Sequence, residues 1–140
     1  MKPEKKNICL FNSCKSWGGG EKWHYETAFR LTERGYKVIL CCQPGSEIFN
    51  RTKDSRIKCY RFRVHNLSFL NPILLLRLII FFKRKKIHTI ILGLPSDVKA
   101  VGIASKLAGV KNIIYRRGTA LPIHNTLLNR FLFLPDIIFE

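Results

Sequence analysis

The stretch that decides the fold reads Asn12-Ser13-Cys14-Lys15-Ser16-Trp17-Gly18-Gly19-Gly20-Glu21. The apolar run Ile8-Cys9-Leu10-Phe11 leads into it and has the length and composition of a buried parallel strand. The run from Glu21 to Arg34 follows it and predicts a helix that Gly35 ends. A strand, a glycine turn and a helix in this order are typical of a phosphate-binding site, because glycines let an anion approach the backbone and a helix start leaves N–H groups unpaired.

The spacing of the three glycines separates this site from two better-defined motifs, although an ordinary strand-to-helix turn also favours glycine. A dinucleotide fingerprint needs G-x-G-x-x-G and an acidic residue at the end of the second strand, where this chain has Cys41-Cys42-Gln43-Pro44. A P-loop needs G-x-x-x-x-G-K-[ST], and the run from Gly18 to Trp23 has neither the spacing nor the hydroxyl. The sequence therefore argues against nicotinamide binding and against an ordinary ATPase.

Three segments follow one another along this part of the chain: Gly18-Gly19-Gly20-Glu21-Lys22, Ala28-Phe29-Arg30-Leu31 and Arg34-Gly35-Tyr36-Lys37-Val38. Their order resembles the opening of the family 4 glycosyltransferases of the GT-B fold. In that family a G-G-A-E-R-like turn begins a helix that ends in L-x-x-R-G-H-x-V before the second strand. The likeness is densest over residues 7–43 and extends over the whole chain as the N-terminal half of such an enzyme.

The chain has 140 residues, which suits one domain with a single core. The resemblance implies that residues 1–140 are the single N-terminal, acceptor-side domain of the enzyme and that the C-terminal nucleotide-sugar domain is absent. The run from Leu134 to Glu140 begins another strand-like segment without a terminating loop. We therefore expect the chain to be truncated there.

The remaining apolar runs predict an open α/β sheet, doubly wound, mainly parallel and Rossmann-like. The run from Val38 to Cys42 is continuous rather than alternating, as expected of a strand covered on both faces. The partial alternation of residues 57–62 suits a strand near the sheet edge. Further strands are expected at residues 89–93 and 112–115, and further helices at residues 47–52, 73–82, 98–108 and 127–132.

Lys and Arg number 25 against 9 Asp and Glu, which gives a formal net charge of +16. This charge predicts attraction to phosphates, anionic lipids or nucleic acid, although each basic cluster could equally be a solvated surface. Nucleic acid is the least favoured partner, since basic residues do not alternate with aromatic ones and no known binding module is present. The alternative to sugar transfer is a non-catalytic basic module that binds anionic membrane or nucleic acid.

The segment from Ile73 to Phe82 is apolar nearly all round and ends in Lys83-Arg84-Lys85-Lys86. Spanning a bilayer takes about 20 apolar residues, and Arg77 interrupts a run that is shorter than this. One interpretation is a buried crossover helix whose cationic end matches the negative end of its dipole. The other is a membrane-surface helix whose four basic residues meet lipid phosphates, in a cytoplasmic protein that is peripheral on the inner face of the cell membrane.

Five cysteines lack the C-x-x-C spacing of metal and redox sites, and we expect no bound metal. Cys9, Cys41, Cys42 and Cys59 fall in strand-like runs, where a thiol behaves as a small hydrophobe. Cys14 is the exception, because it lies outside these runs, beside the glycine turn, where its thiol could react; we expect no catalytic role for it. We expect no signal peptide before the first strand, and hence reduced thiols in a cytosol.

In an open parallel sheet, ligands bind beyond the carboxyl ends of the strands. The segment after the first strand holds Ser13 and the glycine turn, and Pro95 and Ser96 follow the fourth strand, so we expect Ser13, Pro95 and Ser96 on the acceptor rim. Arg116-Arg117-Gly118 follows the fifth strand. Arginine binds phosphate or carboxylate in a bidentate manner, so this run joins the glycine turn as a candidate contact to an anion. The alternative for the arginines is a solvated loop.

The resemblance implies a retaining hexosyltransferase that moves a sugar from a nucleotide-sugar donor to a surface-glycan or lipid-linked acceptor, without a metal or other cofactor. The glycine turn would approach the donor diphosphate, and residues 1–140 alone should be inactive. Many relatives carry a histidine near the transferred sugar where this chain has Arg117-Gly118. Either an arginine meets a phosphate or an acidic sugar here, or the matching position lies a few residues away. No residue is assigned a catalytic role.

Overall fold

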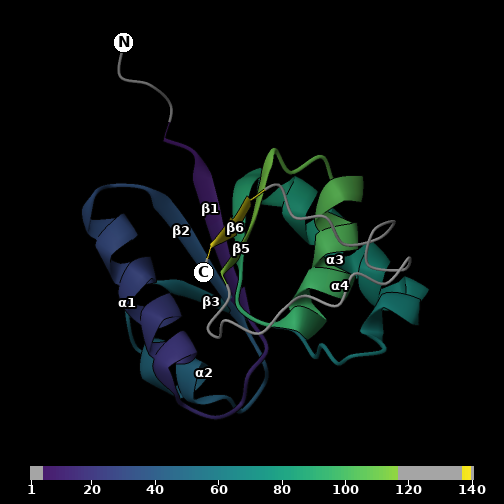
Figure 1. The fold of residues 1–140 in the computed structure, drawn as a ribbon. Coiled ribbons are helices and arrows are strands. Elements are labelled where there is room, and N and C mark those ends of the chain that lie inside the picture. The colour runs from purple at the N-terminus through teal and green to yellow at the C-terminus, as the bar shows by residue number, and fades with distance from the viewer. Residues whose placement is uncertain (1–4, 117–136, 140) are drawn as a thin grey trace.

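One parallel sheet organises the residues that the computed structural model describes, which are 5–116 and 137–139 (Figure 1). Its strands lie in the order β3-β2-β1-β4-β5-β6, and each pairs in parallel with its neighbours. Their bounds are β1 Asn7–Asn12, β2 Lys37–Cys42, β3 Lys58–Arg61, β4 Ile87–Leu92, β5 Asn112–Arg116 and β6 Ile137–Phe139. The expected open α/β sheet is confirmed, and this strand order is that of a doubly wound Rossmann fold.

Helices cover both faces of the sheet (Figure 1). Their bounds are α1 Gly19–Glu33, α2 Glu47–Thr52, α3 Pro72–Arg84 and α4 Pro95–Leu107, with a short 3₁₀ helix at Ser68–Leu70 before α3. α1 and α2 lie on one face, and α3 and α4 lie on the other. Along β1, Leu10 joins the core under α1, whereas Phe11 joins the core under α3 and α4. Neither side chain has exposed surface, so this strand is covered on both faces as predicted.

Most elements lie within a few residues of their predicted ends. α1 begins at Gly19, two residues earlier than expected, because Gly18 already has the extended conformation of an N-cap residue (φ −150°, ψ −168°). The helix closes at Gly35, whose φ of +83° is the left-handed conformation that glycine adopts without strain. β3 is an edge strand, as its alternation predicted. The run at the end of the sequence contributes β6, whereas the helix expected at residues 127–132 lies outside the described residues.

The two ends of α3 lie at opposite edges of the sheet. The helix starts after Asn71, whose side-chain oxygen accepts hydrogen bonds from the Ile73 and Leu74 amides, on the side of the carboxyl ends of the strands. It ends just before β4 begins at Ile87. The run from Lys83 to Lys86 therefore lies at the amino edge of the sheet, about 20 Å along the helix axis from its start.

α3 is buried along one side only. Leu74, Leu78 and Phe82 pack into the core, as the crossover-helix interpretation requires. Ile73 and Leu76 are 72% and 57% exposed on the other side. The outer side of the helix therefore exposes aliphatic side chains together with Arg77.

The strand cysteines form a contact that their spacing did not predict. The Cys42 and Cys59 sulfur atoms lie 3.1 Å apart on neighbouring strands, and both thiols are free. This hydrogen bond, more than any charge nearby, lowers the pKa of Cys59 to about 7. The contact with Cys42 thus favours the thiolate form of Cys59.

Candidate functional site

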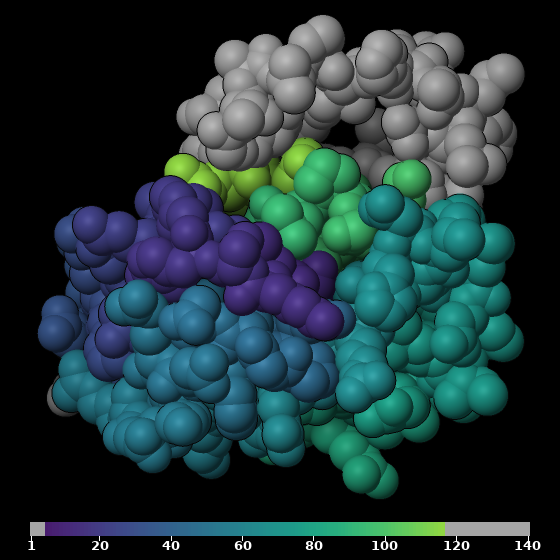
Figure 2. Space-filling model, turned by 90° about the horizontal axis from the view of Figure 1, so that it is seen from below, coloured from purple at the N-terminus to yellow at the C-terminus, as the bar shows by residue number. Residues whose placement is uncertain are grey.

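The candidate site lies at the carboxyl ends of β1, β4 and β5. The strand order reverses between β1 and β4, because β1 is followed along the chain by β2 on one side and β4 lies on its other side. Ligands of open α/β sheets bind at such a switch point. Figure 2 looks onto this rim, where the purple segment after β1 adjoins the green segment that follows β4. The rim is built from the segment after β1, the first turns of α1 and α4, and the end of β5.

Ser13 is tied to the start of α4. Its amide donates to one carboxylate oxygen of Asp97 at 3.2 Å, and its hydroxyl donates to the other at 2.5 Å. Asp97 has no exposed surface, and this burial raises the pKa of its carboxyl to about 7, although the Ser13 hydrogen bonds act in the opposite direction. The predicted acceptor-rim residue Ser13 therefore lies at the rim, but its hydroxyl is engaged in holding β1 against α4.

A second buried cluster joins the end of β1 to α1. The Asn12 side-chain nitrogen donates to Glu21 at 3.3 Å, and its oxygen accepts from the Cys14 amide at 2.9 Å. His24 is fully buried beside this pair, and neither ring nitrogen has a hydrogen-bond partner among the described residues. Burial first, and the positive charge of Arg116 second, lower the pKa of His24 to about 3. The imidazole is therefore neutral at physiological pH.

Gly93, directly after β4, lies against this cluster. A Cβ atom at this position would come within 2.8 Å of both the Asn12 nitrogen and the His24 Nε2 atom. No real Cβ contact is so short, so a larger residue would force these side chains or the backbone to move. The absence of a side chain at Gly93 therefore leaves the room that Asn12 and His24 occupy beside the end of β4.

The glycine turn leaves the start of α1 open. Gly18, Gly19 and Gly20 all lack positive φ values, so their backbone conformations do not themselves require glycine. Gly18 provides no side-chain cap, and nothing among the described residues lies within 4 Å of where a Cβ at Gly19 would be. Among the described residues, no side chain caps the first-turn amides, which lie at the positive end of the helix dipole. A carboxylate oxygen of Glu21 would lie 3.1 Å from a Cβ at Gly18, so the open side of the turn is at Gly19.

Arg116 brings a positive charge to the same helix start. Its guanidinium carbon lies 4.8 Å from the centre of the Trp23 ring, and one of its nitrogens would be 3.6 Å from a Cβ at Gly20. Stacking on an indole holds a guanidinium in place without neutralising it. Arg117 and Gly118, which complete this predicted run, lie outside the described residues.

The remaining predicted residues divide into inward-facing and outward-facing ones. Glu21 is buried, with its carboxylate turned toward Asn12. Lys22 is exposed and makes only a long contact of 3.8 Å with Glu26, which contributes little to stability. Pro95 is exposed and Ser96 half-buried in the first turn of α4. The arrangement thus offers backbone amides and Arg116 to an anion, with Pro95 and Ser96 across the rim.

Two residues of this site were not predicted from the sequence. Asp97 was missed, although an acidic residue in the first turn of a helix that follows a strand is a signal that could have found it. His24 lies in the helix expected after the glycine turn, where a lone histidine most often has a structural role. Nothing in the local sequence indicates that its ring is buried against Gly93, because that contact is made between distant parts of the chain.

The described part of the chain holds neither a metal cluster nor a membrane span. No three His, Cys, Asp or Glu side chains gather there in a way that could hold a metal ion. No described helix is both long and apolar enough to cross a membrane.

Solved structures with a similar fold are GT-B glycosyltransferases. MurG of Acinetobacter baumannii matches with a TM-score of 0.70 and 16% identity, over 95% of this chain and 40% of that one. HepE of Anabaena in complex with UDP-glucose matches with a TM-score of 0.62 and 15% identity, over 79% and 28%. WaaB, a lipopolysaccharide outer core galactosyltransferase, matches with a TM-score of 0.58 and 13% identity, over 80% and 32%.

At these identities the likeness shows the fold alone. The chain has the Rossmann-like α/β fold that these enzymes contain, and it spans 28% to 40% of their lengths. The sequence matches no protein-family model and no curated protein sequence.

The packing at Gly93 predicts a position-specific effect of alanine. We expect Gly93→Ala to lower the free energy of unfolding by about 1–3 kcal/mol, because its Cβ collides with Asn12 and His24. Gly102→Ala in α4 is the matched control, since nothing lies within 4 Å of its added Cβ. Alanine there should stabilise the helix by about 0.5–1 kcal/mol. Urea unfolding of the two variants measures both effects, and equal effects would contradict this account of Gly93.

The two buried titratable groups predict opposite pH dependences. The pKa of Asp97 is raised from 3.8 to about 7, so its contribution to stability is lost as the pH rises through this range. The pKa of His24 is lowered from 6.5 to about 3, so its contribution is lost as the pH falls through that range. Between about pH 4 and pH 6.5 the two contributions offset each other.

When either group is removed, the free energy of unfolding should therefore vary with pH as the remaining group dictates. In Asp97→Asn the free energy of unfolding should rise with pH between about 4 and 6.5, and in His24→Gln it should fall between about 4 and 7, each by up to about 1.4 kcal/mol per pH unit. Urea unfolding at a series of pH values gives these slopes. Identical slopes in the two variants would refute the assignment.

Proposed function

We propose that this chain is the N-terminal, acceptor-side lobe of a retaining glycosyltransferase. The full enzyme would move a sugar from a nucleotide-sugar donor to a surface-glycan or lipid-linked acceptor at the cytoplasmic face of the membrane. The observation that carries the proposal is the open start of α1 at the switch point of the sheet, with Arg116 beside it. The similarity of the fold to MurG and to HepE, which was solved with UDP-glucose, supports it.

The proposed roles follow from the charge of a diphosphate. The free amides of Gly19, Gly20 and Glu21 would approach its oxygen atoms, and the Arg116 guanidinium would balance the negative charge that the leaving nucleoside diphosphate gains. Such a site works without a metal ion, because fixed N–H groups and a guanidinium supply the positive charge. A second lobe would hold the nucleotide, and the Pro95 and Ser96 side of the rim would face the acceptor.

The proposal predicts where a diphosphate perturbs the chain. In an amide NMR titration with UDP-glucose, UDP and inorganic pyrophosphate, we expect the amides of Gly18 to Glu21 to shift with all three ligands. Gly19→Val should abolish these shifts, because its side chain would occupy the open space that the anion needs, while the fold is unchanged. Arg116→Gln should weaken binding about tenfold through the loss of a charged hydrogen bond.

Arg30→Gln is the matched control for this experiment. Arg30 is an exposed residue in the last turn of the same helix, so its replacement removes the same charge from the far end. The affinity of the Arg30→Gln variant for the three ligands should stay within about twofold of that of the unsubstituted chain. Exposed charges that lie more than a Debye length from a ligand are screened by salt. Shifts spread over the basic surface, or equal losses in the two arginine variants, would count against a diphosphate site at α1.

A second outcome concerns turnover. Residues 1–140 alone should bind a nucleotide sugar without splitting it, because the proposed nucleotide-holding lobe is not part of this chain. Incubation with UDP-glucose, UDP-galactose or UDP-N-acetylglucosamine, followed by measurement of released UDP, tests this expectation. Turnover by this chain alone would refute the assignment of a half-site.

A further inference from the structure

Four of the five cysteines gather on three neighbouring strands. Cys9 lies on β1, Cys41 and Cys42 follow each other on β2, and Cys59 lies on β3. Since successive side chains of a strand point to opposite faces, these cysteines form two pairs, one on each face of the sheet. The Cys9 and Cys41 sulfur atoms are 3.6 Å apart, and those of Cys42 and Cys59 are 3.1 Å apart. Each face of the sheet thus holds two free thiols in contact.

The two pairs differ in their access to solvent. Cys9 and Cys41 have no exposed surface, so a reagent in solution does not reach them in the folded chain. Cys42 is buried to the same extent, but its partner Cys59 is half-buried on β3, the edge strand. A small solute can therefore reach the second pair through Cys59.

The second pair is also chemically asymmetric. The hydrogen bond to Cys59 first, and burial second, raise the pKa of Cys42, which keeps its proton. The same hydrogen bond outweighs burial at Cys59 and lowers the pKa there to about 7, and the Thr52 hydroxyl and the Arg61 charge act in the same direction. The thiolate is the attacking form of cysteine, so Cys59 is the nucleophile of the pair and Cys42 is the second thiol beside it.

A disulfide between these two residues requires only a small movement of β3. The sheet register places Cys59 opposite Leu40, two residues before Cys42, so the two cysteines lie diagonally across neighbouring strands. A disulfide joins sulfur atoms about 2.05 Å apart, so the two atoms must approach each other by about 1 Å. β3 has four residues and pairs only with β2 in the described sheet, so a single ladder restrains it. A bridge that has to pull a strand out of place is easier to reduce than a relaxed one.

We infer that Cys42 and Cys59 are a site of reversible oxidation, at which a hydroperoxide converts the two thiols into a disulfide. The Cys59 sulfur attacks one oxygen of hydrogen peroxide, an S–O bond forms as the O–O bond breaks, and the leaving hydroxide becomes water with the proton that Cys59 released. The Cys42 sulfur then attacks the Cys59 sulfenic acid, an S–S bond forms as the S–O bond breaks, and the hydroxyl group leaves as water with the Cys42 proton. Both sulfur atoms are oxidised, and one peroxide is reduced to two waters.

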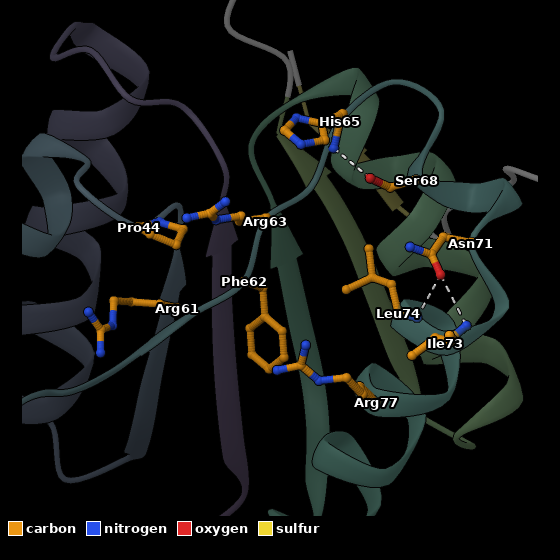
Figure 3. Close-up of a pocket in the computed structure, with 10 residues that line it drawn as sticks. All are labelled: Pro44, Arg61, Phe62, Arg63, His65, Ser68, Asn71, Ile73, Leu74 and Arg77. Carbon is orange, nitrogen blue, oxygen red and sulfur yellow. Dashed lines mark hydrogen bonds between the residues drawn. The ribbon is translucent and has the colours of Figure 1, made fainter.

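The bond would act on the wall of a hollow of about 570 Å³ between β3 and the start of α3 (Figure 3). Pro44 and Arg61, each two residues beyond one of the two cysteines, line this hollow. Drawing β3 along β2 would change their relative positions. The arginines that line the hollow, none of which forms an ion pair among the described residues, are Arg61, Arg63 and Arg77. Oxidation would therefore alter a positively charged opening, and it involves none of the residues at the start of α1.

Peroxide treatment of the folded chain tests this inference. The starting chain carries Cys14→Ser, because Cys14 is a half-buried thiol outside the two pairs and would compete. After treatment with hydrogen peroxide, we expect the mass to fall by two hydrogen atoms and the tryptic peptides that contain Cys42 and Cys59 to be linked. Dithiothreitol should restore the original mass. Cys41→Ala is the matched control, since it removes an equally buried thiol from the same strand, and it should leave the link intact.

The order of the two steps has its own variant pair. Cys42→Ser keeps a hydrogen-bond donor beside Cys59 but removes the second sulfur, so the sulfenic acid on Cys59 should persist and react with dimedone. Cys59→Ser leaves only the buried Cys42 thiol of the pair, so the yield of its dimedone adduct should be about tenfold lower or less. Far-UV circular dichroism of both variants should match that of the starting chain.

Oxidation should also be detectable at the hollow. Amide NMR spectra of the reduced and oxidised chains should differ at Gln43, Gly45 and Arg61, which adjoin the new bond or line the hollow. The amides of Gly18 to Glu21 should keep their positions. This result separates the oxidation site from the proposed diphosphate site, because either can fail without the other.

Five results would overturn the inference. An unchanged mass would mean that the pair does not react, and a link that forms only in urea would show that the native strands hold the two sulfur atoms apart. Loss of the link in Cys41→Ala would assign the oxidation to the neighbouring thiol. A gain of oxygen atoms without a link would mean that Cys59 is oxidised to a sulfinic acid. A link that dithiothreitol does not cleave would contradict reversibility.

Discussion

The hydrogen bonds between Ser13 and Asp97 fix the geometry on which the candidate site depends. They join residues 84 positions apart and hold the end of β1 against the first turn of α4. Burying the Asp97 carboxyl group without these partners would lower the stability of the fold, so the contact is also needed for folding. Gly93 leaves room beside this contact for Asn12 and His24, and Asn12 in turn bonds Glu21 in the first turn of α1. The starts of α1 and α4 are thus joined to the end of β1 by buried polar contacts.

The elements of this fold could be predicted from the sequence because they depend on local patterns. Continuous apolar runs identified β1 and β2 as strands covered on both faces, and Gly35 marked the end of α1. The asymmetric burial of α3 could not be obtained in the same way. Its sequence is apolar nearly all round, so no polar stripe distinguishes the side that packs on the sheet from the side left in water. Which side is covered depends on the contacts of α3 with the sheet and with α4, which its own sequence does not contain.

The site was only partly predictable, because its buried members make contacts between distant segments. The glycine turn and Arg116 could be found from their positions after strands, and the strand order brings them together. His24 carries no such signal, since its surroundings come from other parts of the chain, and the position of Asp97 in the first turn of α4 does not reveal its contact with Ser13. The Cys42 and Cys59 contact has the same origin, because the register between β2 and β3 decides it. Likewise, Arg63 and Arg77 are two ordinary basic residues until β3 and α3 face each other.

The carboxyl edge of the sheet thus carries two anion-attracting surfaces that work by different means. At the switch point, no side chain caps the start of α1 among the described residues, and nothing there lies within 4 Å of a Cβ at Gly19, so an anion could come close to the backbone. At the start of α3 the amides are capped, so only the longer reach of the arginine side chains is available. The first suits a ligand held close and oriented by the backbone, whereas the second offers an anion only side-chain contacts.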